Sequence, residues 1–184
     1  SLTIKRICST HGPVWEKNIS EVIALYDRMS RYETERGVCL VYGSMYGNTA
    51  AAADALAMEL EALGIPYAIH DLAGNNAGEL GVSGALRDVF KYDTIVVGSP
   101  TYNNGIYLPV ANLLHDMECL TVQNKVIALA QNGTWAPVSA KLMNEKLSTL
   151  KNVKIVDNVL TIKSALHASD EEALDVFVEA VTEA

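Results

Sequence analysis

The chain has 184 residues, a formal net charge of -8 and three cysteines. A chain of this length can bury one substantial core without disulfides, and its acidic balance argues against nonspecific nucleic-acid binding, which needs basic groups. No apolar run approaches the roughly 18 residues of a membrane span, and no secretory signal opens the sequence. The cysteines lack metal-site or CxxC spacing, so we expect small buried residues in a reducing, cytoplasmic protein. They are Cys8, Cys39 and Cys119.

The first 35 residues differ from the rest of the chain. A turn-rich stretch precedes apolar residues at helical spacing, which predict a helix over residues 18–32. Asn18 is its expected N-cap, and Glu21 is the expected capping-box partner. Because the pattern that follows is complete without this segment, we expect residues 1–35 to be a packing arm or the tail of a neighbouring domain, and residues 36–184 to form a second domain.

Short apolar runs alternate with helical patterns along the second domain. The expected strands are residues 38–43, 67–71, 93–100, 125–133 and 153–162. The expected helices are residues 51–64 (starting near Asn48), 82–92, 108–120, 137–150 and 169–184, the last capped by Ser169. This alternation predicts an α/β fold with about five parallel strands and right-handed crossovers. Such sheets bind ligands at the carboxyl ends of their strands, so the loops after the first, third and fourth strands should converge.

The first of these loops, GSMYGNT (residues 43–49), contains no lysine or arginine. It lacks the GxxxxGK of nucleotide hydrolases and the GxGxxG of dinucleotide-binding folds. It offers main-chain N–H groups at a helix N-terminus and the hydroxyls of Ser44 and Thr49, which suit an anion without a cationic side chain. We interpret the loop as a cradle for one phosphate monoester. The alternative is an ordinary strand–helix turn with a hydroxyl cap.

The second loop, GSPTYNNGIYLP (residues 98–109), carries aromatic and amide side chains. Tyr102 suits the face of a flat ring, and the amides of Asn103 and Asn104 suit a ring edge rich in donors and acceptors. Gly105 allows a peptide to rearrange at low steric cost. The alternative is a simple Asn-Asn-Gly turn with a partly exposed tyrosine.

The third loop, QNGTWAP (residues 131–137), places Gly133 and Trp135 at the end of the fourth strand. Tryptophan has a large apolar face and one N–H donor, and the alternative is a core or interface residue. Together the three loops predict a site for a flat, phosphate-tailed cofactor, flavin mononucleotide (FMN). The predicted cofactor-binding residues are Ser44, Met45, Tyr46, Gly47, Asn48, Thr49, Pro100, Thr101, Tyr102, Asn103, Asn104, Gly105, Asn132, Gly133 and Trp135.

In this order GSMYGNT, GSPTYNNGIYLP and NGTW resemble the flavin loops of flavodoxins, and more narrowly those of the flavodoxin domain of flavodiiron proteins, or A-type flavoproteins. The resemblance runs from Glu35 to the C-terminus. It implies a flavodoxin-like three-layer sandwich with a five-stranded parallel sheet in the order 2-1-3-4-5. The third loop departs from the family, because Ala136, Pro137 and Val138 stand where members often carry glycines.

The N-terminal STHGPVW and KNISEVIALYDRMS resemble the last turn and linking helix of the family's diiron domain, which has a metallo-β-lactamase-like fold. The resemblance makes residues 1–35 a remnant of that domain and His11 the counterpart of an iron ligand. A lone histidine cannot hold two irons, so no metal is expected in this chain.

In the family the flavin feeds electrons to the diiron centre, which reduces oxygen or nitric oxide. The resemblance therefore implies an electron-transfer domain that is an oxidoreductase only within the intact protein. It also implies a redox donor, such as rubredoxin or a reductase, and the family's head-to-tail homodimer.

Two other functions compete with this interpretation. One is an FMN-dependent NAD(P)H:quinone reductase of the same fold. The other is a cofactor-free signalling module such as a receiver domain, but that class needs acidic residues where Gly43 and Ser44 stand. We expect no catalytic cysteine or histidine, and the histidines at 70, 115 and 167 suit a strand end, a helix face and a loop.

Overall fold

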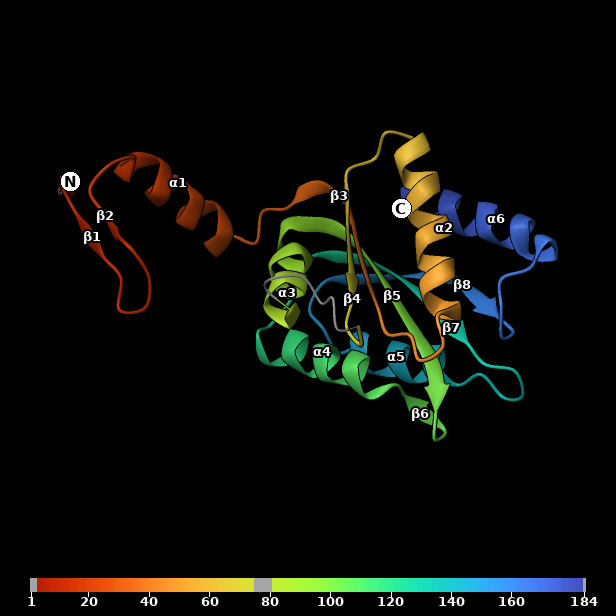
Figure 1. Ribbon diagram of the computed structural model, residues 1–184. Coiled ribbons are helices and arrows are strands. Elements are labelled where there is room, and N and C mark those ends of the chain that lie inside the picture. The colour runs from red at the N-terminus through yellow and green to blue at the C-terminus, as the bar shows by residue number, and fades with distance from the viewer. Residues whose placement is uncertain (1–2, 75–80, 184) are drawn as a thin grey trace. The chain divides into compact units, whose positions relative to one another are not determined.

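The computed structural model describes residues 3–74 and 81–183 of the chain. The chain divides into two compact units, Ser1–Glu33 and Thr34–Ala184. No helix within the described residues is long and apolar enough to cross a membrane. Figure 1 labels the elements of both units in chain order.

The smaller unit holds a short hairpin and one helix. Strands β1 (Ile7–Cys8) and β2 (Val14–Trp15) pair antiparallel, and α1 spans Ile19–Ser30. Asn18 occupies the N-cap position with a left-handed backbone (φ 53°), and its side chain makes no capping hydrogen bond. The predicted capping box with Glu21 is therefore wrong, because such a box requires an N-cap residue with an extended backbone.

The larger unit is built around the predicted sheet. Five parallel strands lie in the order β4-β3-β5-β7-β8, which confirms the predicted 2-1-3-4-5 topology. A short strand without a counterpart among the predicted elements, β6, pairs antiparallel with the end of β5. The strands are β3 (Glu35–Tyr42), β4 (Tyr67–Asp71), β5 (Tyr92–Tyr102), β6 (Gly105–Ile106), β7 (Lys125–Asn132) and β8 (Val153–Ile162).

Helices cover both faces of this sheet, as expected for a three-layer sandwich (Figure 1). Helices α2 and α6 pack on one face, and α3, α4 and α5 pack on the other. Alternate residues of β3 enter the two cores, Val38 and Leu40 on the α2 side and Cys39 and Val41 on the other. The strand reads as one continuous apolar run because both of its faces are buried. The helices are α2 (Asn48–Ala62), α3 (Gly81–Lys91), α4 (Leu108–Cys119), α5 (Ser139–Leu147) and α6 (Glu171–Thr182).

The start of α6 differs from the prediction. A 3-10 turn, Ala168–Asp170, leads into the helix, and Ser169 lies inside that turn. The main-chain N–H of His167 donates to Asp170 Oδ2 over 2.9 Å. Ser169 is therefore not the cap, because the capping interaction begins two residues earlier.

The cysteines do not share one environment. All three are free, and only Cys39 is buried; burial raises the pKa of its thiol to about 12. Cys8 and Cys119 are exposed, so the expectation of buried cysteines is wrong for these two. Cys119 ends α4 on its solvent side, where its Sγ lies 3.5 Å from Nε2 of His115, one turn earlier.

A buried carboxylate ties the edge strand β4 to α3. Asp88 Oδ2 lies 2.9 Å from His70 Nε2 and also accepts a hydrogen bond from the Arg87 guanidinium over 2.8 Å. The hydrogen bond from Arg87, followed by that with His70, holds the pKa of Asp88 below its ordinary value. His70 therefore has a structural partner, as expected for a residue at a strand end.

The amino end of β7 carries a buried cation. Lys125 is 4% exposed, and its Nζ donates to the carbonyl oxygens of Phe90 (3.1 Å) and Tyr92 (2.5 Å). These carbonyls belong to the end of α3 and the start of β5, where a helix C-terminus favours a positive charge. Burial nevertheless lowers the pKa of Lys125 to about 8.

We expect that the free energy of unfolding of the Lys125→Met variant lacks the rise with pH that Lys125 contributes in the wild type. Folding lowers the lysine pKa from 10.5 to about 8, so in this window the unfolded chain binds more protons and the free energy of unfolding rises with pH. Buried Cys39 opposes this rise above pH 9, but it remains in both proteins. The free energy of unfolding of the wild type minus that of the variant should therefore increase by up to about 3 kcal/mol from about pH 7 to about pH 11.

Urea unfolding at several pH values measures this difference, and Lys154→Met, on the exposed part of β8, is the control. Parallel stability curves for wild type and Lys125→Met across the window would contradict the assignment.

Candidate cofactor site

The loops that follow β3, β5 and β7 all leave the sheet at the carboxyl ends of its strands. Strand register places Tyr42 beside Gly98 and Pro100 beside Asn132, so the three strands end next to one another. In Figure 1 the turn into α2, the end of β5 and the loop after β7 gather on the same side of the molecule. The predicted convergence of these loops is therefore present.

The first loop ends in a helix N-terminus with an open approach. Gly47 is the N-cap of α2 with a left-handed backbone (φ 85°), and a Cβ built there meets nothing within 4 Å. Ser44 Oγ accepts hydrogen bonds from the N–H groups of Gly47 (3.1 Å) and Ala50 (3.4 Å). The N–H groups of Asn48 and Thr49 belong to the first helical turn, where no intrahelical acceptor exists. The loop thus combines main-chain donors with hydroxyls and no side-chain charge.

Two glycines let this loop approach its neighbours closely. A Cβ at Gly43 would lie 2.7 Å from the ring of Tyr107. A Cβ at Gly98 would lie 3.1 Å from Tyr42 Cβ and 3.7 Å from the methyl group of Thr49. Side chains at either glycine would push α2 and the second loop away from the strand ends.

The second loop is a tight hairpin. Tyr102 pairs with Gly105 across β5 and β6, and the two residues between them, Asn103 (φ 48°) and Asn104 (φ 55°), are both left-handed. This is the two-residue type I′ geometry, which asparagine tolerates well. Tyr102 is 37% exposed and contacts Tyr107 edge-on, with ring centroids 5.9 Å apart. The Asn-Asn-Gly turn with a partly exposed tyrosine, considered from the sequence, is therefore present, and the contact of Tyr102 with a flat ring stays a prediction.

Thr101 links the second loop to the third. Its Oγ1 accepts hydrogen bonds from the N–H groups of Val138 (3.0 Å) and Ser139 (3.2 Å) at the start of α5. Gln131 Oε1 accepts the next amide, that of Ala140, over 3.1 Å. These two side chains satisfy amides that a helix cannot pair internally. The Thr101 hydroxyl therefore caps α5.

The third loop presents Trp135 to solvent. This side chain is 96% exposed, which excludes the core placement considered from the sequence. The loop itself is anchored at its base, where the Asn132 side-chain amide donates to the carbonyl of Ser164 (2.8 Å) and the Gly133 N–H donates to the carbonyl of Ile162 (3.0 Å). The Asn132 side chain is therefore directed to protein.

The predicted site residues do not share one environment. Met45, Tyr46, Tyr102 and Trp135 are exposed around the rim and Thr49 is buried, whereas the side-chain polar atoms of Thr101 and Asn132 bind neighbouring loops. Sequence reasoning missed three residues that hold the loops in place. They are Gln131, Ser139 and Ser164. Ser164 follows the fifth strand, so the rule that ligands bind at strand carboxyl ends was a signal for it.

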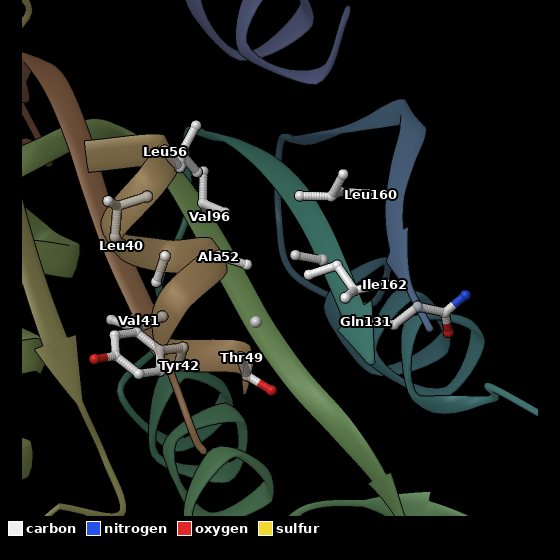
Figure 2. Close-up of a pocket in the computed structure, with 13 residues that line it drawn as sticks. Leu40, Val41, Tyr42, Thr49, Ala52, Leu56, Val96, Gln131, Leu160 and Ile162 are labelled. Carbon is white, nitrogen blue, oxygen red and sulfur yellow. The ribbon is translucent and has the colours of Figure 1, made fainter. Parts of the chain in front are cut away.

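A small cavity lies beneath the first turns of α2 (Figure 2). Its volume is about 20 Å³, enough for about one water molecule. Figure 2 shows Thr49 and Gln131 among otherwise largely apolar neighbours. Tyr42 also lines it, and burial, with the nearby charges of Asp71 and Asp54, raises the tyrosine pKa to about 12. A three-ring system cannot enter this space, so the cavity cannot hold the ring of the predicted cofactor.

Comparisons with known proteins agree with this fold. The family model described as Flavodoxin matches residues 40–174. The nitric oxide reductase of Moorella thermoacetica is 29% identical over 152 residues, which are 82% of this chain and 37% of that protein. The rubredoxin oxygen:oxidoreductase of Desulfovibrio gigas superposes with a TM-score of 0.85 at 23% identity, covering 97% of this chain and 44% of that one. The flavodiiron protein of Giardia intestinalis superposes with a TM-score of 0.83 at 23% identity, covering 98% and 43%.

The chain spans less than half of the length of these relatives. Its likeness to the solved structures shows the shared fold, and the family-model match covers most of the chain. The chain therefore belongs to the flavodoxin family and is similar to the flavodoxin-like part of flavodiiron proteins.

Proposed function

We propose that this chain is an FMN-binding electron-transfer domain that, in the intact protein, delivers electrons to a diiron centre reducing oxygen or nitric oxide. The observation that carries the proposal is the uncharged loop at the start of α2, where Gly47 borders open space next to exposed aromatic residues. FMN combines these two requirements, because it has one phosphate monoester and one flat ring.

The donor set of the first loop fits the phosphate. Main-chain N–H groups at a helix N-terminus bind anions without a lysine or arginine, and each hydrogen bond to a charged group contributes about 1.5–3 kcal/mol. In the structure Ser44 Oγ accepts hydrogen bonds from the N–H groups of Gly47 and Ala50. A bound phosphate would accept from the same donors, and the Ser44 hydroxyl would turn to donate to it.

The rim fits the ring. Tyr46 is 86% exposed, and it joins Tyr102 and Trp135 in offering aromatic faces at the edge where the loops meet. Such faces stack on flat heteroaromatic rings. The residues proposed to hold FMN are Ser44, Met45, Tyr46, Gly47, Asn48, Thr49, Pro100, Thr101, Tyr102, Asn103, Asn104, Gly105, Asn132, Gly133 and Trp135, of which Thr101 and Asn132 act through the main chain and the loop positions.

When bound, FMN supplies one- and two-electron redox chemistry. The chain's own residues bind it, orient it and cover its faces. No charged side chain lies within residues 43–49, 98–109 or 131–137, so main-chain dipoles of the loops contribute much of the field at the site. Tyr42, below the site, keeps its proton throughout the physiological range because its pKa is about 12.

The N-terminal segment extends the proposal to the intact protein. Residues 1–35 would be the end of a diiron domain with a metallo-β-lactamase-like fold, with His11 as one of its ligands. Structural matches that include nearly the whole chain support this view, as do the exposed apolar residues of α1, which are Ile23, Leu25, Tyr26 and Met29. The proposed electron donor is rubredoxin or a reductase, the proposed assembly a homodimer, and the proposed compartment the cytoplasm.

Titration with FMN tests the cofactor assignment. In the Trp15→Phe variant Trp135 is the single tryptophan, and we expect FMN to quench its fluorescence with micromolar or tighter affinity. The protein should remain yellow after gel filtration. Trp135→Phe, which keeps Trp15, measures quenching that does not arise at the third loop. A colourless protein without quenching would reject FMN binding.

A further inference from the structure

The end of β8 and the turn that follows it form hydrogen bonds with the third loop that no loop prediction included. Three of them lie at the base of the third loop. Asn132 Nδ2 donates to the Ser164 carbonyl over 2.8 Å, Thr134 Oγ1 and Ser164 Oγ lie 2.8 Å apart, and the Gly133 N–H donates to the Ile162 carbonyl over 3.0 Å. Three successive residues of the third loop are therefore bound to one short segment.

Ser164 has the backbone of a turn residue. Its φ of 71° is left-handed, which is uncommon for a residue other than glycine, asparagine or aspartate. In this conformation both its carbonyl and its hydroxyl reach the third loop. The Asn132 side-chain amide, which donates to the Ser164 carbonyl, is buried. A buried donor without an acceptor costs about 1–3 kcal/mol. The turn at Ser164 is therefore coupled to the third loop.

The far end of the third loop is held separately. Thr101 Oγ1 accepts the N–H groups of Val138 and Ser139, and a Cβ at Gly133 would lie only 3.2 Å from Pro137. The segment between these anchors is short and carries the almost fully exposed Trp135. These hydrogen bonds therefore restrain the main chain on both sides of Trp135.

We propose that Ser164, with Thr134, is a positioning residue of the cofactor site: the segment after β8 acts as a fourth loop that holds Trp135 in place for the flavin ring. This inference rests on the proposed function in naming FMN as the ligand. The restraint itself is a property of the protein alone and can be measured without cofactor.

The test uses the Trp15→Phe background and the full chain. Thr134→Val removes the hydroxyl with little change in shape, Ser164→Ala removes the other hydroxyl, and Thr134→Ser restores the hydrogen bond. Time-resolved fluorescence anisotropy without FMN is expected to show faster local motion of Trp135 in the first two variants and wild-type motion in Thr134→Ser. FMN dissociation constants should rise about three- to tenfold in the same two variants, and the midpoint potential of bound FMN should shift with them.

Two controls separate positioning from general destabilisation. Thr149→Val removes an equivalent exposed hydroxyl, bonded to the Lys146 carbonyl far along α5, and should change neither anisotropy nor affinity. The double variant Thr134→Val/Ser164→Ala should show the same anisotropy and FMN affinity as either single variant, because each single substitution removes the same hydrogen bond.

Unchanged Trp135 motion in Thr134→Val and Ser164→Ala would overturn the proposal. So would faster motion with unchanged FMN affinity and potential. If the unaltered protein binds no FMN, the proposed function fails together with the role toward the flavin, whereas anisotropy still shows whether the segment restrains the loop.

Discussion

Ser44→Asp is expected to weaken FMN binding at least about a hundredfold while the protein remains as stable as the wild type or becomes more stable. The Ser44 hydroxyl accepts hydrogen bonds from the Gly47 and Ala50 N–H groups at the start of α2. A carboxylate can accept the same bonds, and a negative charge at a helix N-terminus stabilises the helix by about 0.3–1 kcal/mol. The folded protein therefore tolerates the change.

The same substitution disfavours binding of the FMN phosphate through electrostatic repulsion. A phosphate monoester carries nearly two negative charges at neutral pH, and two like unit charges 4 Å apart repel by about 4 kcal/mol at an effective dielectric constant of about 20. Solvent at the rim screens part of this repulsion, and the remainder still corresponds to a loss of about a hundredfold or more. The loop contains no lysine or arginine to offset it.

Riboflavin provides the matched ligand, because it has the same ring and lacks the phosphate. Ser44→Asp should leave riboflavin affinity within about threefold of the wild type, and the neutral Ser44→Asn should retain most FMN affinity. Fluorescence titrations with both ligands, combined with thermal unfolding, measure binding and stability separately. Equal losses for riboflavin and FMN, or no loss for FMN, would show that residues 43–49 do not hold the phosphate.

Gly37→Ala is expected to destabilise the protein by about 4 kcal/mol through a clash that the sequence does not reveal. Gly37 lies in a bulge of β3, where the register shifts between Glu35 and Val38. Its φ of 154° is unfavourable for alanine. A Cβ there would lie 2.5 Å from the Tyr92 ring and 2.6 Å from the main-chain carbonyl oxygen of Pro66. Backbone strain and overpacking each cost about 1–3 kcal/mol, and the carbonyl cannot rotate away.

Gly64→Ala is the matched control. Gly64 follows α2 with a φ of 68°, and a Cβ there meets nothing within 4 Å. This substitution therefore carries only the cost of a left-handed alanine, about 1–2 kcal/mol. Urea unfolding of both variants isolates the contribution of the clash at Gly37. Similar losses in the two variants would contradict the close packing of β3 against Tyr92 and Pro66.

Much of the fold follows from local patterns in the chain. Runs such as 38–43 and 93–100 are apolar on both faces, and this property alone predicts buried parallel strands between two helix layers. Loops at the carboxyl ends of such strands must meet, so the convergence of residues 43–49, 98–109 and 131–137 was also predictable. The lack of lysine and arginine in residues 43–49 predicts main-chain recognition of an anion there, and this remains a prediction.

Other features depend on partners that are remote in the sequence. Asn132 was expected among the cofactor-binding residues, yet its side-chain amide donates to the carbonyl of Ser164, 32 residues away. Thr101 was expected beside the cofactor, yet its hydroxyl caps α5. In the sequence Lys125 resembles an ordinary strand residue, but the end of α3 and the start of β5 bring the carbonyls of Phe90 and Tyr92 to its Nζ. In each case a polar side chain has several possible partners, and the packing of distant segments determines which of them it binds.

The sequence by itself determined the α/β class, the strand order through its resemblance to flavodoxins, and the positions of the loops that carry the candidate site, because periodicity and loop composition are local properties. Only the tertiary structure decided which polar side chains point to protein and which remain free for a ligand. It also decided that the Trp135 side chain lies in solvent and that the turn at Ser164 is hydrogen-bonded to the third loop. The physical reason is that a hydrogen bond depends on the position and direction of both partners, and for residues far apart in the chain the folded backbone alone sets these.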